Sequence, residues 1–253
     1  MSNEAQNEFW NGPAGDVWVE AQEFMDRMLE PLSRLAIDKA ALAAGERAID
    51  VGCGCGGTSL ALAERGGAVW GLDISAPMVA RAKERADGHD TVAFSVGDAA
   101  VHAYTADHQL VFSRFGIMFF DDPKTAFSNL RSALTPDGRL VFLCWQVPRE
   151  NLWMSVAGRA VQPYLPEADA QDPRAPGPFA FADPDWIHEI LADAGFTNGE
   201  IESITPDIRI GGSGDEARPF PSRGGPRARA VAQRAAPTRA QANEAGPPPP
   251  RDH

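Results

Sequence analysis

The chain has 253 residues and a mass of 27.1 kDa, enough for one α/β domain with a substantial core. Its formal net charge of −12 at pH 7 argues against a nucleic-acid partner, because proteins that bind nucleic acids usually carry a basic face. No apolar run approaches the roughly 18 residues of a membrane-spanning helix, and the acidic first residues do not form a secretory signal. With three cysteines, an odd number, we expect a cytoplasmic protein without a membrane span.

Residues 1–45 are expected to form an N-terminal helical cap. From Asp16 onward, apolar residues recur near helical spacing. Pro31 is expected to divide this stretch into two helices, since proline lacks the N–H group that a helix interior needs. Two tryptophans, Trp10 and Trp18, allow two interpretations: they cover a cofactor pocket, or they pack against the sheet in the ordinary way.

Residues 46–146 contain the stretch around which the chain is organised. A buried strand ends at Val51, a glycine-rich turn carries Gly52 and Gly54, and a helix and a second strand follow, ending at Asp73. This is a β-α-β unit whose glycine turn lets a ligand lie against main-chain N–H groups. A carboxylate at the end of the second strand can accept hydrogen bonds from both hydroxyls of a ribose.

Two cofactors are compatible with this unit. Gly52, Gly54 and Gly57 match G-x-G-x-x-G, the fingerprint of dinucleotide-binding proteins, which would indicate an NAD(P)-binding oxidoreductase. Asp50 favours the other cofactor, because a carboxylate there would repel a pyrophosphate and suits a cationic amino-acid group. We therefore expect S-adenosyl-L-methionine, which carries an ammonium, a sulfonium, a ribose and an adenine but no phosphate. A cofactor-binding protein without turnover is the third interpretation.

Two cysteines lie inside the glycine turn. Cys53 and Cys55 flank Gly54, as a metal-binding or redox pair would, but no further cluster of Cys and His follows. We favour small side chains that fill a tight turn, and we expect no metal.

Further candidate residues follow the later strands. Met78 can cover the adenine or ribose, and Asp98, after the third strand, can accept a hydrogen bond from the adenine amino group. Ligands of open parallel sheets bind at the carboxyl ends of the strands, so Ser113, at the end of the fourth strand, should border the reactive methyl group. The cofactor-binding candidates are Asp50, Gly52, Cys53, Gly54, Asp73, Ile74, Met78, Asp98, Ala99 and Ser113.

A catalytic base is needed only if the methyl acceptor must lose a proton. His102 and Tyr104 lie in a short loop after the third strand and are the candidates for this role.

Together these motifs resemble the class I S-adenosylmethionine-dependent methyltransferases, of the broad small-molecule group that includes the ubiquinone and menaquinone C-methyltransferases. The resemblance covers about residues 8–212. It is based on D-x-G-x-G-x-G, Asp73, Gly97-Asp98, S-R-F-G at 113–116 and P-D-G-R-L-V-F from Pro136. It implies a Rossmann-like, doubly wound, mainly parallel sheet with helices on both faces. It also implies methyl transfer to a small-molecule acceptor that no motif identifies.

The segment after the fifth strand also has two interpretations. Residues 147–182 are rich in proline and aromatic side chains, and they form either a lid over the acceptor pocket or an ordinary surface excursion. Residues 183–214 are expected to contain the last helix and a sixth strand.

Residues 215–253 depart from the rest of the chain. They contain seven Arg, no Lys, eight Pro and nine Ala, and their only large apolar residues are Phe220 and Val231. Such a segment buries too little apolar surface to offset its ordering entropy, so we predict a disordered tail and a missing seventh strand. A shifted reading frame in GC-rich coding DNA would produce this composition, which is our hypothesis for its origin.

Overall fold

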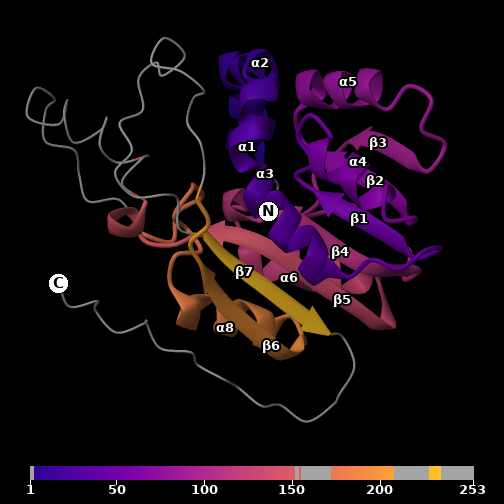
Figure 1. The fold of residues 1–253 in the computed structure, drawn as a ribbon. Helices are drawn as coiled ribbons and strands as arrows, with labels where there is room; N and C mark the ends of the chain where they lie inside the picture. Colours follow the sequence, from indigo (N-terminus) through magenta and orange to yellow (C-terminus); the bar gives the residue numbers. More distant parts are fainter. Residues whose placement is uncertain (1–2, 152–153, 155–171, 208–227, 235–253) are drawn as a thin grey trace, which may run out of the picture.

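The computed structural model describes residues 3–151, 154 and 172–207, together with the backbone of residues 228–234. The strands are β1 (Arg47–Val51), β2 (Ala68–Asp73), β3 (Val92–Val96), β4 (His108–Arg114), β5 (Leu134–Trp145), β6 (Thr197–Ile204) and β7 (Ala228–Arg234). They form one sheet in the order β3-β2-β1-β4-β5-β7-β6 (Figure 1). β1 to β5 are parallel, and β7 is antiparallel to both of its neighbours. The expected Rossmann-like, mainly parallel sheet is therefore confirmed.

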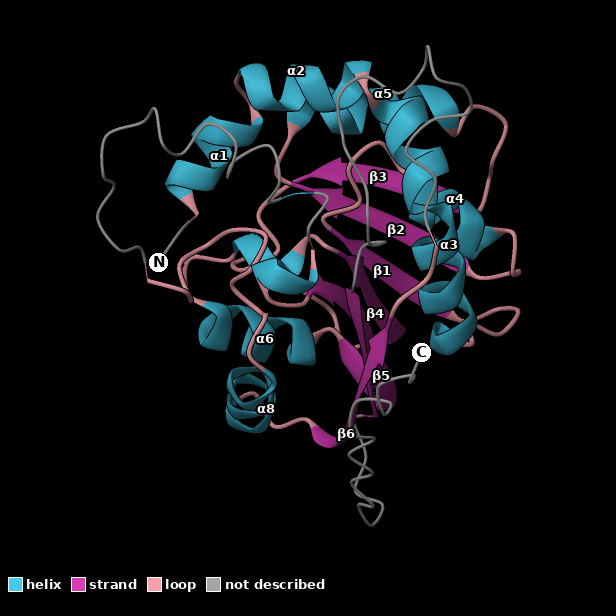
Figure 2. Ribbon diagram, turned by 60° about the vertical axis from the view of Figure 1, so that its left-hand side comes forward, coloured by secondary structure: helices cyan, strands magenta, loops and turns pink. Residues whose placement is uncertain are grey.

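Helices cover both faces of this sheet (Figure 2). One face carries α3 (Gln22–Ala40), α4 (Gly57–Ala63) and α5 (Ala76–Arg85), and the other carries α6 (Pro123–Ser132) and α8 (Pro184–Asp193). Two short N-terminal helices, α1 (Glu4–Trp10) and α2 (Pro13–Glu20), precede them, and the 3-10 turns are η1 (Ile117–Phe119) and η2 (Pro148–Glu150). No helix within these described ranges is long and apolar enough to cross a bilayer.

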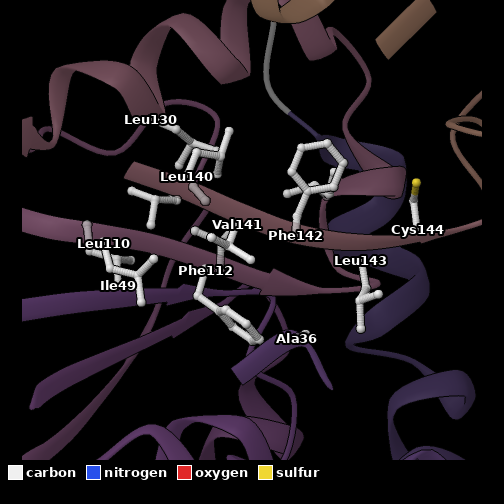
Figure 3. Packing of buried hydrophobic residues seen from close by; sticks show 14 of the residues in the cluster. Ala36, Ile49, Leu110, Phe112, Leu130, Leu140, Val141, Phe142, Leu143 and Cys144 are labelled. Atoms are coloured by element: carbon white, nitrogen blue, oxygen red, sulfur yellow. The ribbon is translucent and has the colours of Figure 1, made fainter. Parts of the chain in front are cut away.

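The central strands explain the long apolar runs of the sequence. Leu110, Val111 and Phe112 of β4 are fully buried because helices lie on both faces of the parallel strands. Figure 3 shows Phe112 directed toward Ala36 of α3. On the opposite face, Phe142 of β5 contacts two aromatic rings, Phe127 of α6 and Phe181, with ring centroids 5.6 and 6.2 Å away.

The expected break at Pro31 was wrong, because α3 continues through this proline as one helix. A proline inside a helix costs about 3 kcal/mol or more. The continuous helix buries one apolar face against the sheet, which offsets that cost. Its buried apolar residues are Met28, Leu29, Leu32, Ala36, Ile37 and Ala40.

The prediction of a missing seventh strand was also wrong. β7 lies inside the segment 215–253, for which we predicted disorder, and it lies between β5 and β6 (Figure 1). Its register runs from Arg139 opposite Arg234 to Trp145 opposite Ala228. The prediction considered only how much apolar surface the segment could bury, whereas backbone pairing on two edges also stabilises a strand. The rest of the tail lies outside the described residues.

Candidate active site

A cavity of about 540 Å³ opens at the carboxyl ends of β1, β2, β4 and β5. Its volume is in the range of small-molecule sites, and its place in the sheet is where open α/β folds bind ligands. Most of the cofactor-binding candidates line it, namely Gly52, Cys53, Gly54, Asp73, Ile74, Met78, Asp98 and Ala99. The structure therefore brings these eight candidates together on one side of the cavity.

The glycine turn after β1 touches the turn after β4 through the backbone alone. Gly52 has a φ of +67°, and a Cβ atom added to it would lie 2.7 Å from the Cα atom of Gly116. A Cβ atom on Gly116 would lie 2.7 Å from the carbonyl oxygen of Val51. Side chains at either position would separate the two turns, so this corner of the cavity requires both glycines.

The carboxylate of Asp73 is held between the glycine turn and the start of α5. Its Oδ2 accepts a hydrogen bond from Gly54 N at 2.7 Å, and its Oδ1 accepts one from Ser75 N at 2.8 Å. Burial raises the pKa of Asp73, and the main-chain N–H groups of Ser75 and Gly54 partly oppose this shift. The side chain lines the cavity in a fixed orientation.

Asp98 accepts two hydrogen bonds from Asn3, a residue that was not among the candidates from the sequence. Asn3 donates from Nδ2 to Asp98 Oδ1 at 2.9 Å and from its backbone N to Oδ2 at 3.2 Å. The Asn3 side chain also accepts a hydrogen bond from Asp121 N at 2.8 Å. These contacts join the N-terminal segment to two loops at the edge of the cavity, and no local pattern around Asn3 indicated them.

Asp50 and Ser113 are the two cofactor-binding candidates that do not line the cavity. Asp50 is fully buried, and its Oδ2 accepts hydrogen bonds from Thr58 Oγ1 at 2.7 Å and Ser59 Oγ at 2.6 Å. Ser113 donates from Oγ to the carbonyl oxygen of Val51 at 2.7 Å. Both side chains therefore make hydrogen bonds within the protein next to the glycine turn instead of lining the cavity.

The buried carboxyl of Asp50 should make stability depend on pH. Burial raises its pKa from 3.8 to about 6, although the hydroxyls of Ser59 and Thr58 oppose the shift. A raised folded-state pKa contributes stability that is present below about pH 4 and is lost as the pH rises through 6. At about 1.4 kcal/mol per pKa unit, the loss is roughly 2–3 kcal/mol.

The variant Asp50→Asn isolates this effect. Denaturant unfolding at several pH values between 4 and 7.5 should show the wild type losing stability relative to Asp50→Asn as the pH rises. Parallel stability curves for the two proteins would show that Asp50 has an ordinary pKa.

The two candidates for a catalytic base are not among the residues that line the cavity, so the structure gives their predicted role no support. His102 and Tyr104 pack against Trp70 on β2, with ring centroids 5.0 and 6.1 Å from it. The hydroxyl of Tyr104 donates to Ala99 O at 3.1 Å, and burial raises the pKa of Tyr104. The loop that follows β3 covers the side of the sheet with these rings instead of directing them at a ligand.

We expect His102→Ala and Tyr104→Phe to retain a kcat close to that of the wild type. Loss of a general base typically lowers the rate by about 100-fold or more, so steady-state kinetics separates the two cases clearly. A loss of that size in either variant, without a change in melting temperature, would restore the catalytic role.

The two cysteines of the glycine turn are buried, unpaired thiols. Burial raises the pKa of Cys53 and raises that of Cys55 to about 11, so both thiols stay protonated at neutral pH. Both line the cavity as small side chains.

Aromatic side chains form another part of the cavity wall. Phe115 and Trp145, at the ends of β4 and β5, stack with centroids 3.9 Å apart and an interplanar angle of 5°. Trp10 contacts Phe119 and Trp18 edge to face, with centroids 5.3 and 6.0 Å away. Both N-terminal tryptophans line the cavity, which favours the first of their two interpretations.

Comparison with known proteins decides between the remaining interpretations of the cofactor. Residues 48–138 match the family model described as a methyltransferase domain. Nocamycin O-methyltransferase of Saccharothrix syringae is 33% identical over 202 residues, which cover 74% of this chain and 71% of the relative. Demethylmenaquinone methyltransferase of Clavibacter sepedonicus is 30% identical over 189 residues, which cover 71% and 77%.

The chain belongs to the class I S-adenosylmethionine-dependent methyltransferases. The predicted cofactor is therefore confirmed, and these relatives give no support to the oxidoreductase interpretation. Among solved structures, Haemonchus contortus phosphoethanolamine N-methyltransferase 2 in complex with S-adenosyl-L-methionine has a TM-score of 0.68 and 21% identity. The match covers 91% of this chain and 60% of that longer one, and it shows the common fold.

Proposed function

We propose that this methyltransferase acts on an apolar, flat small molecule held against the aromatic wall of the cavity. The observation that carries the proposal is the stacked pair of Phe115 and Trp145, which shares one cavity with Asp73 and the glycine turn. The sheet order places β1 and β4 between β2 and β5, so the ribose carboxylate and Trp145 are separated by three strand spacings, roughly 14 Å. That separation leaves room for an acceptor beside the cofactor.

The residues of the cavity fit S-adenosylmethionine, which when bound supplies a methyl group on a good leaving group. In this proposal Asp73 binds the ribose hydroxyls, and Ile74, Met78 and Ala99, which also line the cavity, supply small or apolar surface for the adenine. The aromatic wall excludes water and orients the acceptor, and alignment of this kind can supply much of the rate enhancement.

No histidine or tyrosine is among the described residues that line the cavity. Of the side chains usually ionised at neutral pH, that wall contains Asp26, Asp73, Asp98 and Arg114. The best acceptor is therefore a nucleophile that already has a reactive lone pair or a readily lost proton, such as an acidic phenol or enol.

Residues 147–182 had two interpretations, a lid over the acceptor pocket or an ordinary surface excursion, and the proposal uses the first of them for part of the segment. Met154 and Pro178 line the cavity. Phe181 instead lies in the core beside Phe127, and residues 152–153 and 155–171 lie outside the described part of the chain.

The test uses S-adenosylmethionine with an isotopically labelled methyl group and a panel of acceptors. Apolar phenols and enols are compared with phosphorylated amines of similar size, and label transfer is followed by mass spectrometry. We expect transfer to the apolar acceptors, increasing with pH until the acceptor is ionised. Transfer to the phosphorylated amines alone would refute the proposal. Cofactor binding without transfer to any acceptor would favour the interpretation as a binding protein without turnover.

A further inference from the structure

Methionine is concentrated in the wall of the cavity. The wall contains 33 of the 253 residues, yet five of the six methionines of the chain belong to it: Met25, Met28, Met78, Met118 and Met154. They come from α3, α5, η1 and the segment after β5, so no single helical face accounts for the grouping. Methionine is unbranched, has three rotatable bonds and carries a polarisable thioether, so it fills irregular spaces and adjusts when their shape changes.

Four of these methionines lie on the acceptor side of the cavity. Met78 belongs to the cofactor side, since its Sδ would lie 3.7 Å from a Cβ atom added to Gly54. Met118 and Met154 follow β4 and β5, and the two methionines of α3 belong to a helix that packs against these same strands. Together the four form the methionine wall: Met25, Met28, Met118 and Met154.

The methionine wall includes both deep and outer parts of the cavity. Met28 and Met118 are 1% exposed, whereas Met25 and Met154 are half-buried. The carbonyl oxygen of Met118 accepts a hydrogen bond from Gly177 N at 3.0 Å, and Met154 N donates to Asn151 O at 3.1 Å. These bonds hold the backbone of two of the methionines, so adjustment to a ligand falls to the side chains.

Phe115 and Trp145 are held more firmly than the methionine side chains. Phe115 has a φ of +65°, a conformation that a bulky residue adopts only where its surroundings determine it. Its backbone N–H group donates to Leu143 O at 3.0 Å, and Gly116, which follows it, lies against the glycine turn. Trp145 is 6% exposed and stacks on the ring of Phe115. The acceptor side therefore combines two fixed rings with an adjustable wall.

We propose that the enzyme methylates flat apolar acceptors of different shapes in this one site. The breadth of this range rests on the proposed function, which supplies the class of acceptor. Phe115 and Trp145 fix the plane of the acceptor ring, so the reactive atom keeps its alignment with the methyl group. The methionine wall adjusts to the rest of the acceptor. A rigid apolar pocket distinguishes ligands that differ by one methylene group by about 10- to 200-fold, and an adjustable wall lowers this discrimination.

The test uses 2-naphthols that carry one ethyl group at different ring positions. These isomers have the same composition and similar acidity, so differences in kcat/KM report the fit of their shapes. The full chain is assayed with saturating S-adenosylmethionine. For the wild type we expect kcat/KM to vary by less than about 10-fold across the set, below the discrimination of a rigid pocket.

Met25→Ile and Met118→Ile stiffen the methionine wall, because a β-branched side chain is restricted at χ1. In each variant we expect the isomers to separate by about 10- to 200-fold in kcat/KM. The affinity for S-adenosylmethionine, measured by titration calorimetry, should stay that of the wild type. Met25→Leu has a similar volume and no branch at Cβ, so it should keep most of the tolerance for shape although it removes the sulfur.

Leu35→Ile is the matched control. Leu35 is an apolar residue of the same helix as Met25, it is 40% exposed, and it is not part of the cavity wall. Introducing a β-branched side chain there should leave the relative kcat/KM values of the isomers as they are in the wild type.

Several results would overturn the inference. A wild type that prefers one isomer by about 100-fold or more has a rigid pocket. Isoleucine variants that keep the wild-type tolerance, or that lose activity equally toward all isomers, would show that the methionines do not provide it. Thermal unfolding establishes that each variant is folded, and the half-buried Met25 gives the answer if Met118→Ile is not. Absence of transfer to every naphthol would refute the proposed function itself, and this range of acceptors with it.

Discussion

Replacing Asp73 with alanine should weaken the binding of S-adenosylmethionine by about 100-fold or more. The role proposed for this carboxylate is to accept two hydrogen bonds from the ribose, and each hydrogen bond to a charged group contributes about 1.5–3 kcal/mol. The backbone N–H groups of Gly54 and Ser75 hold it in the required orientation, so little freedom is lost on binding. Titration calorimetry with S-adenosylmethionine measures the loss directly.

Two ligands that share the ribose, S-adenosylhomocysteine and methylthioadenosine, distinguish the loss of a ribose contact from a general loss of structure. Asp73→Ala should weaken the binding of both ligands to a similar extent, because both carry the ribose. Asp90→Ala, at an exposed position outside the cavity, is the control and should bind normally. Alanine also leaves the Gly54 and Ser75 N–H groups without their acceptor, so thermal unfolding must show that the variant is folded under assay conditions. Unchanged affinity in a folded variant would remove the ribose role of Asp73.

Proline at position 231 should destabilise the protein by about 3 kcal/mol or more, because a proline in a central strand removes a ladder hydrogen bond and clashes with the pairing. Val231 lies in the middle of β7, opposite Phe142 of β5 on one side and Ile201 of β6 on the other. For a chain of this size, that loss corresponds to a fall in melting temperature of roughly 6–12 °C.

Val231→Thr keeps the backbone N–H group and a β-branched side chain, so it is the control for this substitution. It should melt much closer to the wild type than Val231→Pro does. Equal melting temperatures for Val231→Pro and the wild type would mean that this part of the tail does not join the sheet, as the composition alone had predicted.

Truncation before residue 208 tests the contribution of β7 to the sheet by removing the whole strand. It removes β7 and leaves one edge of β5 unpaired, although Leu140, Phe142 and Leu143 are fully buried in the complete sheet. An unpaired edge beside a buried strand favours association between copies of the chain. We therefore expect the truncated chain to aggregate on heating before it shows a cooperative transition.

The grouping of these candidates at one cavity was predictable from the sequence because they are local. Gly52, Gly54 and Asp73 belong to one β-α-β unit, in which strand ends, turn and helix start lie close together whatever the rest of the chain does. Asp98 follows the next parallel strand, which must end at the same edge of the sheet. The class of cofactor followed from the acidic character of these strand ends.

The tertiary structure decided which side of each strand end a residue faces and which distant segments come together. Asp50 and Ser113 face away from the cavity, and His102 turns toward Trp70, because packing against the covering helices and loops selects the face of a short segment. Asn3 and Asp26 reach the site from the N-terminal region by long-range contacts, which leave no periodic pattern in the chain.

The strands of the sheet also differ in whether the sequence or the tertiary structure determined them. The sequence alone determined β1 to β5, since parallel strands covered on both faces need continuous apolar runs, and these are visible without a structure. It could not determine β7, whose composition is that of a disordered segment. That strand is held by backbone groups paired on two edges, and backbone pairing depends on which neighbours the fold provides rather than on the side chains of the strand.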